Sequence, residues 1–411
     1  MKGLSHMFAG LRRRGALVAL LFAFALLVAA CAESDSSTTT TSAAPGTTAA
    51  PTTTAPPSTT APPETTTLPP PPEGNTVLAC QVSDVGGIDD KSFNQSAWKG
   101  SQDAAAELEG VSIEFLESQD AADYRPNIDA FINQGCDVIL TIGFLLAADT
   151  AAAAADNPEQ LFGIVDQAPG PFEPWADASG TMLADYLNVR GITFETDEAA
   201  FLAGYLAAGM SESGAVGTYG GLPIPPVTIF MDGFVRGVAR YNEVNGTSVQ
   251  ALGYDVETGD GLFTNNFESQ DDGRAFTQTL IDNGADIVLP VAGPVGNGTA
   301  ALCAETSACM MIGVDADWFE TAPEYGAIYL TSVLKNIDVA VFNTINNVLV
   351  LGGIGNSYIG TLANDGVGLA PFHDVAVPQE LADAVAAEQA AIIAAGSLEA
   401  YLEALAAPEE G

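Results

Sequence analysis

The sequence predicts an α/β fold made of two lobes, each with a parallel sheet covered by helices on both faces. From residue 76 onward, short apolar runs alternate with stretches of helical spacing or composition. This alternation breaks once, at 167–180, and then starts again. Two successive β/α series separated by a break indicate two sheets in two lobes, because a single barrel would continue without interruption.

The first series contains four predicted strands with three predicted helices between them. The strands are the apolar runs at 76–82, 111–117, 137–143 and 161–166, and the helices are the stretches at 92–108, 124–135 and 145–157. Each strand is short and continuously apolar, which is typical of a parallel sheet buried on both faces.

The second series is expected to begin at the run "VRGITF", after the break. Its predicted strands lie at 189–194, 214–220, 248–254, 285–293 and 308–315, and its predicted helices at 197–210, 227–242 and 274–284. The same rules apply to these elements, so the second lobe should repeat the architecture of the first.

The N-terminus has the layout of an export signal. The basic "LRRRG" precedes an apolar run at 16–30 that is too short for an ordinary membrane span, and small residues follow. The segment ends in "LVAAC", which resembles the lipobox of bacterial lipoproteins, so residues 1–31 are expected to be a signal peptide with Cys31 as the lipid-bearing residue. The alternative is an ordinary signal peptide with an incidental cysteine.

Residues 32–74 consist mainly of threonine, proline, serine and alanine. Such a composition buries too little apolar surface to offset its ordering entropy, and proline keeps it extended. We therefore expect a disordered stalk between a lipid anchor in the cell membrane and an extracytoplasmic globular head.

The charge of the chain excludes two classes of partner. Lys and Arg number 12 against 52 Asp and Glu, a net charge of −40. Such a surface repels nucleic acid and anionic lipid headgroups, so no nucleic acid partner is expected and membrane contact should come only through the lipid anchor.

Four cysteines lie beyond the signal: Cys80, Cys136, Cys303 and Cys309. In an oxidising compartment their even number permits two disulfides, although four buried free thiols are equally compatible with the sequence. His373 is the one histidine of the head, so a zinc site is not expected, and no other metal or cofactor is indicated.

Six loops directly follow apolar strands and share glycine, aromatic or charged residues. In open parallel sheets ligands bind beside the carboxyl ends of the strands, so we expect one site where these loops meet, between the lobes. The loops are "DVGGIDDKSFNQ" (84–95), "GFLLA" (143–147), "VDQAPG" (165–170), "VAGPVGNGT" (291–299), "GVDADW" (313–318) and "TSVLKN" (331–336).

Charged residues at strand ends are the first candidates for that site. Lys335 follows a predicted strand in a chain with few cations, so it is expected to pair with carboxylates or ligand oxygens rather than extend to the surface. Asp84, Asp166 and Asp315 each end an apolar strand and can accept hydrogen bonds from a ligand. Helix N-capping is the alternative role for each of the three.

Two phenylalanines are the candidate aromatic contacts. Phe93 follows the acidic loop of the first series, and Phe267 lies in a loop of the second, so one ring from each lobe would clamp a planar ligand. Core packing is the alternative. The sequence has no G-x-S-x-G nucleophile motif, and although paired carboxylates for glycoside hydrolysis remain open in so acidic a chain, a binding protein is expected rather than an enzyme.

Four segments resemble the basic membrane protein family of bacterial lipoproteins, which includes the purine nucleoside receptors of ABC importers. They are "DVGGIDDKSFNQSAWKG", "GADIVLPVAGPVGNGT", "IGVDADW" and "TSVLKNID". The resemblance implies a type I periplasmic-binding-protein fold, with two Rossmann-like lobes joined by three crossovers around a hinged cleft. The corresponding boundaries are 75–187 plus 318–352 for lobe I and 188–317 plus 353–411 for lobe II.

The same resemblance implies roles for individual residues. Phe93 and Phe267 would sandwich a purine, with Asp84, Asn94 and Asp166 lining the pocket, while Asp315 and Lys335 would hold ribose hydroxyls. A monomer that delivers the nucleoside to an ABC transporter permease is then expected.

Three points stay open. Phe263 could replace Phe267 as the stacking ring, and Trp318, where the family usually has glutamine, is expected to alter the cleft rim. Some relatives bind other ligands such as riboflavin, and a surface receptor or adhesion lipoprotein is the alternative function.

Overall fold

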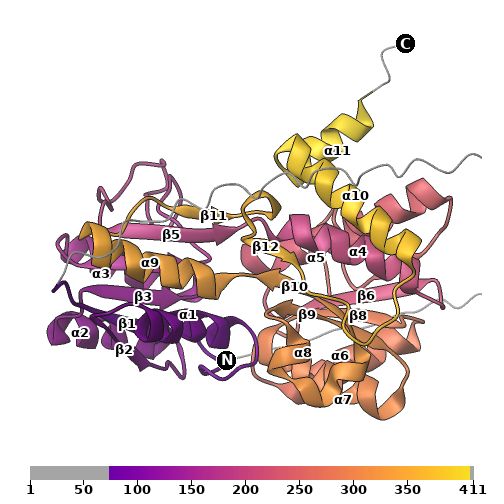
Figure 1. Cartoon of the computed structure of the whole chain (residues 1–411), viewed down its shortest axis with the longest axis horizontal. Coiled ribbons are helices and arrows are strands. Elements are labelled where there is room, and N and C mark those ends of the chain that lie inside the picture. Colours follow the sequence, from indigo (N-terminus) through magenta and orange to yellow (C-terminus); the bar gives the residue numbers. More distant parts are fainter. Residues whose placement is uncertain (1–73, 408–411) are drawn as a thin grey trace, which may run out of the picture. The chain divides into compact units, whose positions relative to one another are not determined.

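The computed structural model describes residues 74–407, so the predicted signal peptide, Cys31 and almost all of the predicted stalk lie outside the described residues. Two six-stranded sheets form the framework of the head (Figure 1). The first has the order β11-β5-β4-β3-β1-β2 and is parallel throughout. Its strands are β1 (Val77–Ser83), β2 (Val111–Leu116), β3 (Val138–Ile142), β4 (Leu161–Val165), β5 (Val189–Phe194) and β11 (Tyr358–Gly360).

The second sheet repeats this arrangement in the order β12-β10-β9-β8-β6-β7. All of its pairs are parallel except that of β10 with β12, which is antiparallel. Its strands are β6 (Ala215–Gly220), β7 (Gln250–Leu252), β8 (Ile287–Val291), β9 (Met310–Asp315), β10 (Tyr329–Lys335) and β12 (Val367–Leu369). The predicted α/β class with two parallel sheets is confirmed.

Helices cover both faces of the first sheet, as the alternation of side chains along β1 shows. Val77 and Ala79 pack with residues of α1 and α9, whereas Cys80 and Val82 pack with residues of α2 and α3. Successive strand residues point to opposite faces, so a continuously apolar strand needs a helical layer on each side. The helices are α1 (Phe93–Glu107), α2 (Tyr124–Gln134), α3 (Ala147–Asp156) and α9 (Ile337–Leu351).

The second sheet also lies between helices. On one face α4 and α5 approach so closely that a Cβ on Gly204 would lie 2.0 Å from the carbonyl oxygen of Phe234. Tyr219 and Val288 of the sheet pack on the other face with residues of α6 and α7. The helices are α4 (Thr196–Met210), α5 (Pro225–Asn245), α6 (Gln270–Asp282), α7 (Gly296–Thr306), α8 (Trp318–Thr321), α10 (Gln379–Ala395) and α11 (Leu398–Ala406).

The C-terminal helices are fastened to the second lobe by a buried polar group. Glu388 of α10 accepts hydrogen bonds from Arg240 of α5, at 3.2 Å, and from the hydroxyl of Tyr401 on α11. Burial and the contact with Glu388 raise the pKa of Tyr401 to about 12. Within residues 74–407 no single helix has the length and apolar composition to cross a bilayer, although α10 and α11, bent relative to each other by 97°, meet that test as a pair.

The chain crosses between the two sheets three times, and all three predicted lobe boundaries are wrong. The crossings follow β5, β10 and β11, so β5 belongs to the first sheet and β10 to the second. The predicted ranges 188–317 and 353–411 placed β5 and β11 in lobe II, and the predicted range 318–352 placed β10 in lobe I. The insert after β4 was read as the lobe boundary. The chain instead returns from the insert to the same sheet, where β5 pairs with β4. Below, lobe I means 74–194 with 336–360, and lobe II means 195–335 with 361–407.

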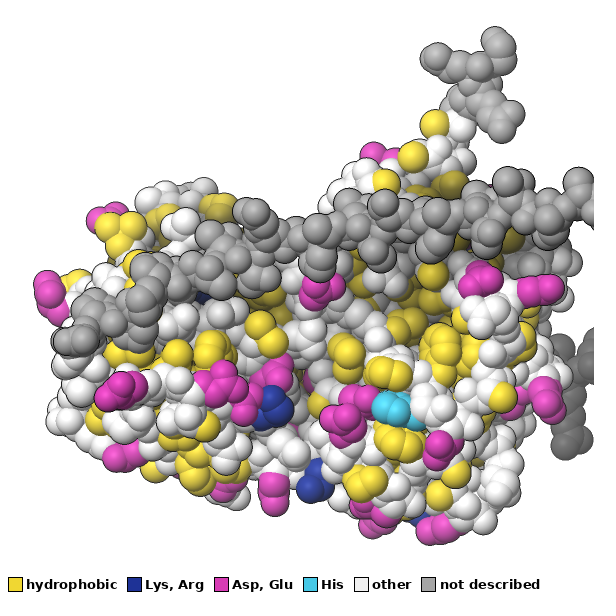
Figure 2. Space-filling view, in the orientation of Figure 1, with side chains coloured by type: hydrophobic (Ala, Val, Ile, Leu, Met, Phe, Trp, Pro, Cys, Tyr) yellow, Lys and Arg dark blue, Asp and Glu magenta, His cyan; other side chains and the backbone are white. Residues whose placement is uncertain are grey.

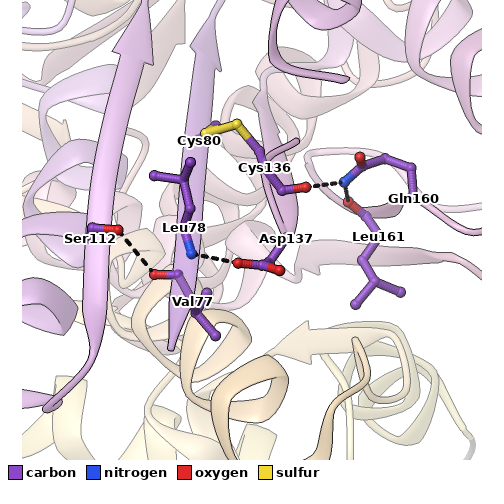
Figure 3. The surroundings of a disulfide bond; sticks show 8 residues. All are labelled: Val77, Leu78, Cys80, Ser112, Cys136, Asp137, Gln160 and Leu161. Carbon is purple, nitrogen blue, oxygen red and sulfur yellow. Dashed lines mark hydrogen bonds between the residues drawn. A yellow bond between two sulfur atoms is a disulfide. The ribbon is translucent and has the colours of Figure 1, made fainter. Parts of the chain in front are cut away.

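Both pairs of cysteines form disulfides. Cys80 of β1 is joined to Cys136, which precedes the neighbouring strand β3, and Cys303 of α7 is joined to Cys309 just before β9. Figure 3 shows the first bond among hydrogen bonds that fix the same end of the sheet, including that from the backbone N–H of Leu78 to Asp137 at 2.7 Å. The four cysteines of the described residues therefore form two disulfides, and the alternative of four buried free thiols is wrong.

Candidate functional site

A cavity at the carboxyl ends of both sheets brings the six predicted loops together. Each loop contributes at least one lining residue, from Asp84 in the first to Lys335 in the last. All seven residues that the sequence singled out for ligand contact line this one cavity: Asp84, Phe93, Asn94, Asp166, Phe267, Asp315 and Lys335. Parallel strands of both lobes end here, which explains why residues so far apart in the sequence meet.

Lys335 forms an ion pair with Asp166 across the two lobes. Its ammonium lies 2.5 and 2.6 Å from the two carboxylate oxygens, and the side chains are only 2% and 8% exposed. The lysine ends β10 of lobe II, and the aspartate follows β4 of lobe I. The carboxylate that Lys335 contacts is therefore that of Asp166, and Lys335 is also near enough to Asp315 to lower the pKa of that carboxyl.

Three phenyl rings surround the same ammonium. Its nitrogen lies 4.9 Å from the ring centroid of Phe93, 5.4 Å from that of Phe194 and 5.9 Å from that of Phe230. A cation over aromatic faces is stabilised by the ring quadrupoles, more strongly where water is excluded. Lys335 is thus held in place by a carboxylate and aromatic rings, which excludes the alternative of a lysine extended to the surface.

Asp166 and Asp315 occupy equivalent positions in the two lobes. Both follow or end a parallel strand, and both have left-handed backbones, with φ of 66° and 67°. Aspartate tolerates this conformation better than most residues, although it is uncommon outside glycine. Burial raises the pKa of both carboxyls, and Lys335 opposes that rise in each case.

A second contact between the lobes involves Ser92 and the end of β9. The hydroxyl of Ser92, just before α1, lies 2.7 Å from Oδ2 of Asp315 and 3.0 Å from the carbonyl oxygen of Val314. Thr321 of lobe II also donates a hydrogen bond to the carbonyl of Lys91 at 2.8 Å. Together with the ion pair, these bonds hold the two lobes together around the cavity.

The beginning of α1 is held by Asp90, a lining residue that we did not single out from the sequence. Its carboxylate accepts backbone N–H bonds from Ser92, Asn94 and Gln95, at 2.9, 3.0 and 3.0 Å. Burial nevertheless raises the pKa of Asp90 to about 6. The signal was present, because an aspartate two residues before a predicted helix often satisfies the free N–H groups of its first turn.

The three strand-end aspartates do not cap helices. Among the hydrogen bonds of the described residues, none runs from a backbone N–H to the side chain of Asp84, Asp166 or Asp315, so their oxygens remain available to a ligand or to other side chains. Asp84 accepts a hydrogen bond from the Asn94 amide at 3.1 Å. It also requires glycine at 143, where φ is 118° and a Cβ would lie 2.1 Å from Oδ2 of Asp84.

The two phenylalanines predicted as aromatic contacts both lie at the cavity, one from each lobe. Phe93 is the first residue of α1, Phe267 precedes α6, and both half-buried rings line the cavity. Glycine at 221 makes room for the second ring, because a Cβ there would lie 2.2 Å from Phe267. Phe263 is not among the lining residues, and its ring packs edge-on against Tyr254 with centroids 6.4 Å apart. Phe267 is therefore the lobe II ring at this cavity.

Trp318 does not form part of the cleft rim. Its side chain is 0% exposed and packs inside lobe II, where the indole N–H donates to the carbonyl of Val314 at 2.9 Å. The expectation that it alters the rim is wrong, because the side chain at this position points into the lobe interior. Within residues 74–407, no group of three or more His, Cys, Asp or Glu side chains is arranged to hold a metal ion.

Several apolar lining residues were also missed. Phe230 comes from α5, and Ile224, Pro226 and Val227 come from the turn and first residues of that helix. They lie in "GLPIPPVTIF", an apolar stretch after β6 whose last residues were assigned to the predicted helix at 227–242. Its one glycine and one phenylalanine are the same features as those of the chosen loop "GFLLA", so it could have been included. Its position after a parallel strand was the available signal. On the face seen in Figure 2, acidic side chains are spread widely and basic ones are few.

Two α/β lobes with three crossovers and a cavity between their sheets define the type I periplasmic-binding-protein fold. The family model described as ABC transporter substrate-binding protein PnrA-like matches residues 78–401. The chain therefore belongs to this family of ABC transporter substrate-binding proteins, which is the family that its motifs resemble.

Individual relatives agree with this assignment. The chain is similar to a Lactococcus lactis subsp. cremoris protein named ABC transporter nucleoside-binding protein BmpA, with 29% identity over 280 residues, covering 66% of this chain and 71% of that protein. It is also similar to basic membrane protein B of Borrelia garinii subsp. bavariensis, with 29% identity over 274 residues, covering 66% of this chain and 73% of that protein. A solute-binding protein structure from Aeropyrum pernix K1 aligns with a TM-score of 0.62 and 26% identity, covering 76% of this chain and 86% of that chain.

Proposed function

We propose that this protein is anchored by lipid to the outer face of the cell membrane and captures purine nucleosides for an ABC importer. The observation that carries the proposal is the cavity, in which one phenylalanine from each lobe is combined with oxygen acceptors and a single ammonium. Flat rings suit a heteroaromatic base, and the polar groups suit N–H groups and ribose hydroxyls. The family supports transport by an ABC system, and the name of the Lactococcus relative supports a nucleoside as ligand.

The ligand class is tested by calorimetry on the purified head. We expect adenosine or guanosine to give saturable heat, and riboflavin to give none. Heat with riboflavin alone would assign the cavity to the other ligand considered above, and no heat with any of the three would support a receptor or adhesion role instead. Mass spectrometry of compounds released by mild denaturation gives an independent identification of the ligand.

The aromatic clamp gives a sharper prediction. Phe93→Ala and Phe267→Ala should each weaken nucleoside binding roughly 5- to 150-fold, because base–aromatic stacking is worth about 1–3 kcal/mol per base. Titration calorimetry measures the affinity, and thermal unfolding measures the stability of the same samples.

Phe263→Ala is the matched control in lobe II, because that half-buried ring lies close in sequence but outside the cavity. It should leave affinity nearly unchanged in the folded protein. Equal losses of affinity for Phe263→Ala and Phe267→Ala would argue against a specific clamp.

The lipid anchor is tested at Cys31, outside the described residues. Cys31→Ala should release the protein into the medium or leave its signal peptide uncleaved, since a lipobox cysteine carries both the cleavage site and the lipid. Cell fractionation and immunoblotting show which occurs. A mutant that stays membrane-bound and is processed to the same size as wild type would contradict lipid anchoring.

A further inference from the structure

Ser92 occupies the N-cap position of α1, but its side chain does not cap the helix. Serine is favoured at this position because its oxygen accepts a hydrogen bond from a free N–H of the first turn. Within the described residues, no backbone N–H donates to the Ser92 hydroxyl. The carboxylate of Asp90 accepts the N–H bonds of Asn94 and Gln95 instead, at 3.0 Å each. The Ser92 hydroxyl is therefore not needed to satisfy the start of α1.

That hydroxyl crosses to lobe II. It lies 2.7 Å from Oδ2 of Asp315 and 3.0 Å from the carbonyl oxygen of Val314, and Ser92 is 0% exposed. A hydrogen bond to an ionised carboxylate is roughly twice as strong as one between neutral groups. Because Asp90 satisfies the helix, Ser92 can join the two lobes.

A second hydroxyl makes a bond in the opposite direction. Thr321, the last residue of α8 in lobe II, donates to the carbonyl oxygen of Lys91 in lobe I at 2.8 Å. The loop before α1 therefore lies beside α8 (Figure 1). Lys91 has a left-handed backbone, with φ of 67°, and its N–H donates to the side chain of Gln95 at 3.2 Å. One hydroxyl from each lobe thus bonds to the other lobe, and we call Ser92 and Thr321 the latch.

Both halves of the latch are positioned by bonds within their own lobes. In lobe I, Asp90 fixes the loop through its three bonds to backbone N–H groups. In lobe II, the backbone N–H of Trp318 donates to the hydroxyl of Ser332 at 3.1 Å, and its indole donates to the carbonyl of Val314 at 2.9 Å. The buried Trp318 therefore holds α8 and the Val314 acceptor in one arrangement. Groups that are already ordered lose little entropy when the lobes close, so their bonds retain more of their free energy.

The two donors of the latch lie outside the cavity. Neither Ser92 nor Thr321 is among the described residues that line it, and neither is Lys91, which accepts the Thr321 bond. The latch bonds join protein to protein, so they contribute to closure whatever the ligand is. They form only when the lobes come together, which happens after a ligand has entered the open cleft.

We propose that Ser92 and Thr321 hold the closed lobes together and set how long the ligand stays bound, although neither residue touches the ligand. The inference rests on the proposed function only for the identity of the ligand. The latch bonds must break before the ligand leaves, so their loss should speed dissociation. They are not yet formed when the ligand enters, so their loss should scarcely change association.

Stopped-flow kinetics with adenosine and guanosine separates the two rates. Ser92→Ala should raise the dissociation rate constant roughly 10- to 150-fold, as expected for a hydrogen bond to a carboxylate. Thr321→Val keeps the shape of the side chain and should raise it about 2- to 10-fold, as expected for a bond between neutral groups. An unchanged dissociation rate constant in either variant would overturn the latch, and so would an effect confined to the association rate constant.

Ser101→Ala is the matched control. Ser101 is a second buried serine, within α1, and its hydroxyl donates to the side chain of Gln81 at 3.0 Å inside lobe I. Its loss should lower the temperature of thermal unfolding and leave the dissociation rate constant unchanged. A rise as large as that of Ser92→Ala would show a general loosening of α1 and would overturn the inference.

The latch can also be tested without a ligand. Small-angle X-ray scattering from the ligand-free purified protein should give a larger radius of gyration for Ser92→Ala/Thr321→Val than for the wild type, because the latch favours closed lobes in either state. If neither nucleoside binds to the wild type, the proposed function is overturned. Equal radii of gyration would in that case overturn the latch as well, and a larger radius for the double variant would support it.

Discussion

Lys335→Met is expected to weaken nucleoside binding by roughly a hundredfold to several thousandfold. The ammonium contacts both oxygens of Asp166 and the pair is almost fully buried, so its loss leaves an isolated carboxylate between the lobes. Removing one partner of a buried ion pair costs about 3–5 kcal/mol, mainly because the remaining charge is desolvated without compensation. Titration calorimetry on the variant measures this loss directly.

The variant should also acquire a pH dependence of known sign. Burial raises the pKa of Asp166, and Lys335 opposes the rise, so without the lysine the pKa in the closed arrangement is higher still. A group with a raised pKa favours the arrangement in which it is protonated. Binding by Lys335→Met should therefore be strongest below about pH 4, the usual aspartate pKa. It should weaken as the pH rises from there through the raised pKa of Asp166.

The double variant Lys335→Met/Asp166→Asn is the control for the charge effect. It removes both charges, so it should bind more tightly than Lys335→Met alone at neutral pH. If the double variant lost as much affinity as the sum of the two single variants, the lysine would act on the ligand and not through its ion pair with Asp166.

Removal of the Cys80–Cys136 disulfide should lower the free energy of unfolding by about 4 kcal/mol. The bond closes a loop with a sequence separation of 56, and in the chain-entropy model a crosslink of that length removes about this much free energy from the unfolded chain. The Cys80→Ala/Cys136→Ala variant, compared with wild type by urea unfolding without reductant, measures the effect. Both cysteines are buried, so the small alanine side chains keep polar groups out of the core.

The second disulfide provides the matched comparison. Cys303 and Cys309 are also buried but only six residues apart, for which the same model gives about 2 kcal/mol. Cys303→Ala/Cys309→Ala should therefore destabilise the protein less than the lobe I variant. Equal losses, or a larger loss for the short loop, would show that native-state packing outweighs loop entropy in this head.

Much of the site could be predicted from local sequence because it follows parallel strands. A strand that is apolar on both faces marks a buried parallel sheet, and the residues after it lie at the carboxyl edge where ligands bind. Asp84, Asp166, Asp315 and Lys335 were found by that rule, and all four line one cavity. Asp90 lies in one of the six chosen loops and the start of α5 follows β6, so both meet the rule as well, although neither was singled out.

The lobe boundaries could not be predicted by the same reasoning. The break at 167–180 looked like the end of a lobe, yet the chain returns from it to add β5 to the first sheet. Strand patterns report the burial of a segment but not the sheet that it joins, because every parallel strand buried on both faces has the same composition.

The sequence by itself determined the α/β class, the family and the loops that form the cavity, because each of these depends on patterns within contiguous residues. Only the tertiary structure decided that Lys335 pairs with Asp166 and not Asp315, that Phe267 and not Phe263 lines the cavity, and that Trp318 is buried. These outcomes depend on distances between side chains of different strands. Such distances are set by strand order and by the packing of the lobes, which local periodicity does not specify.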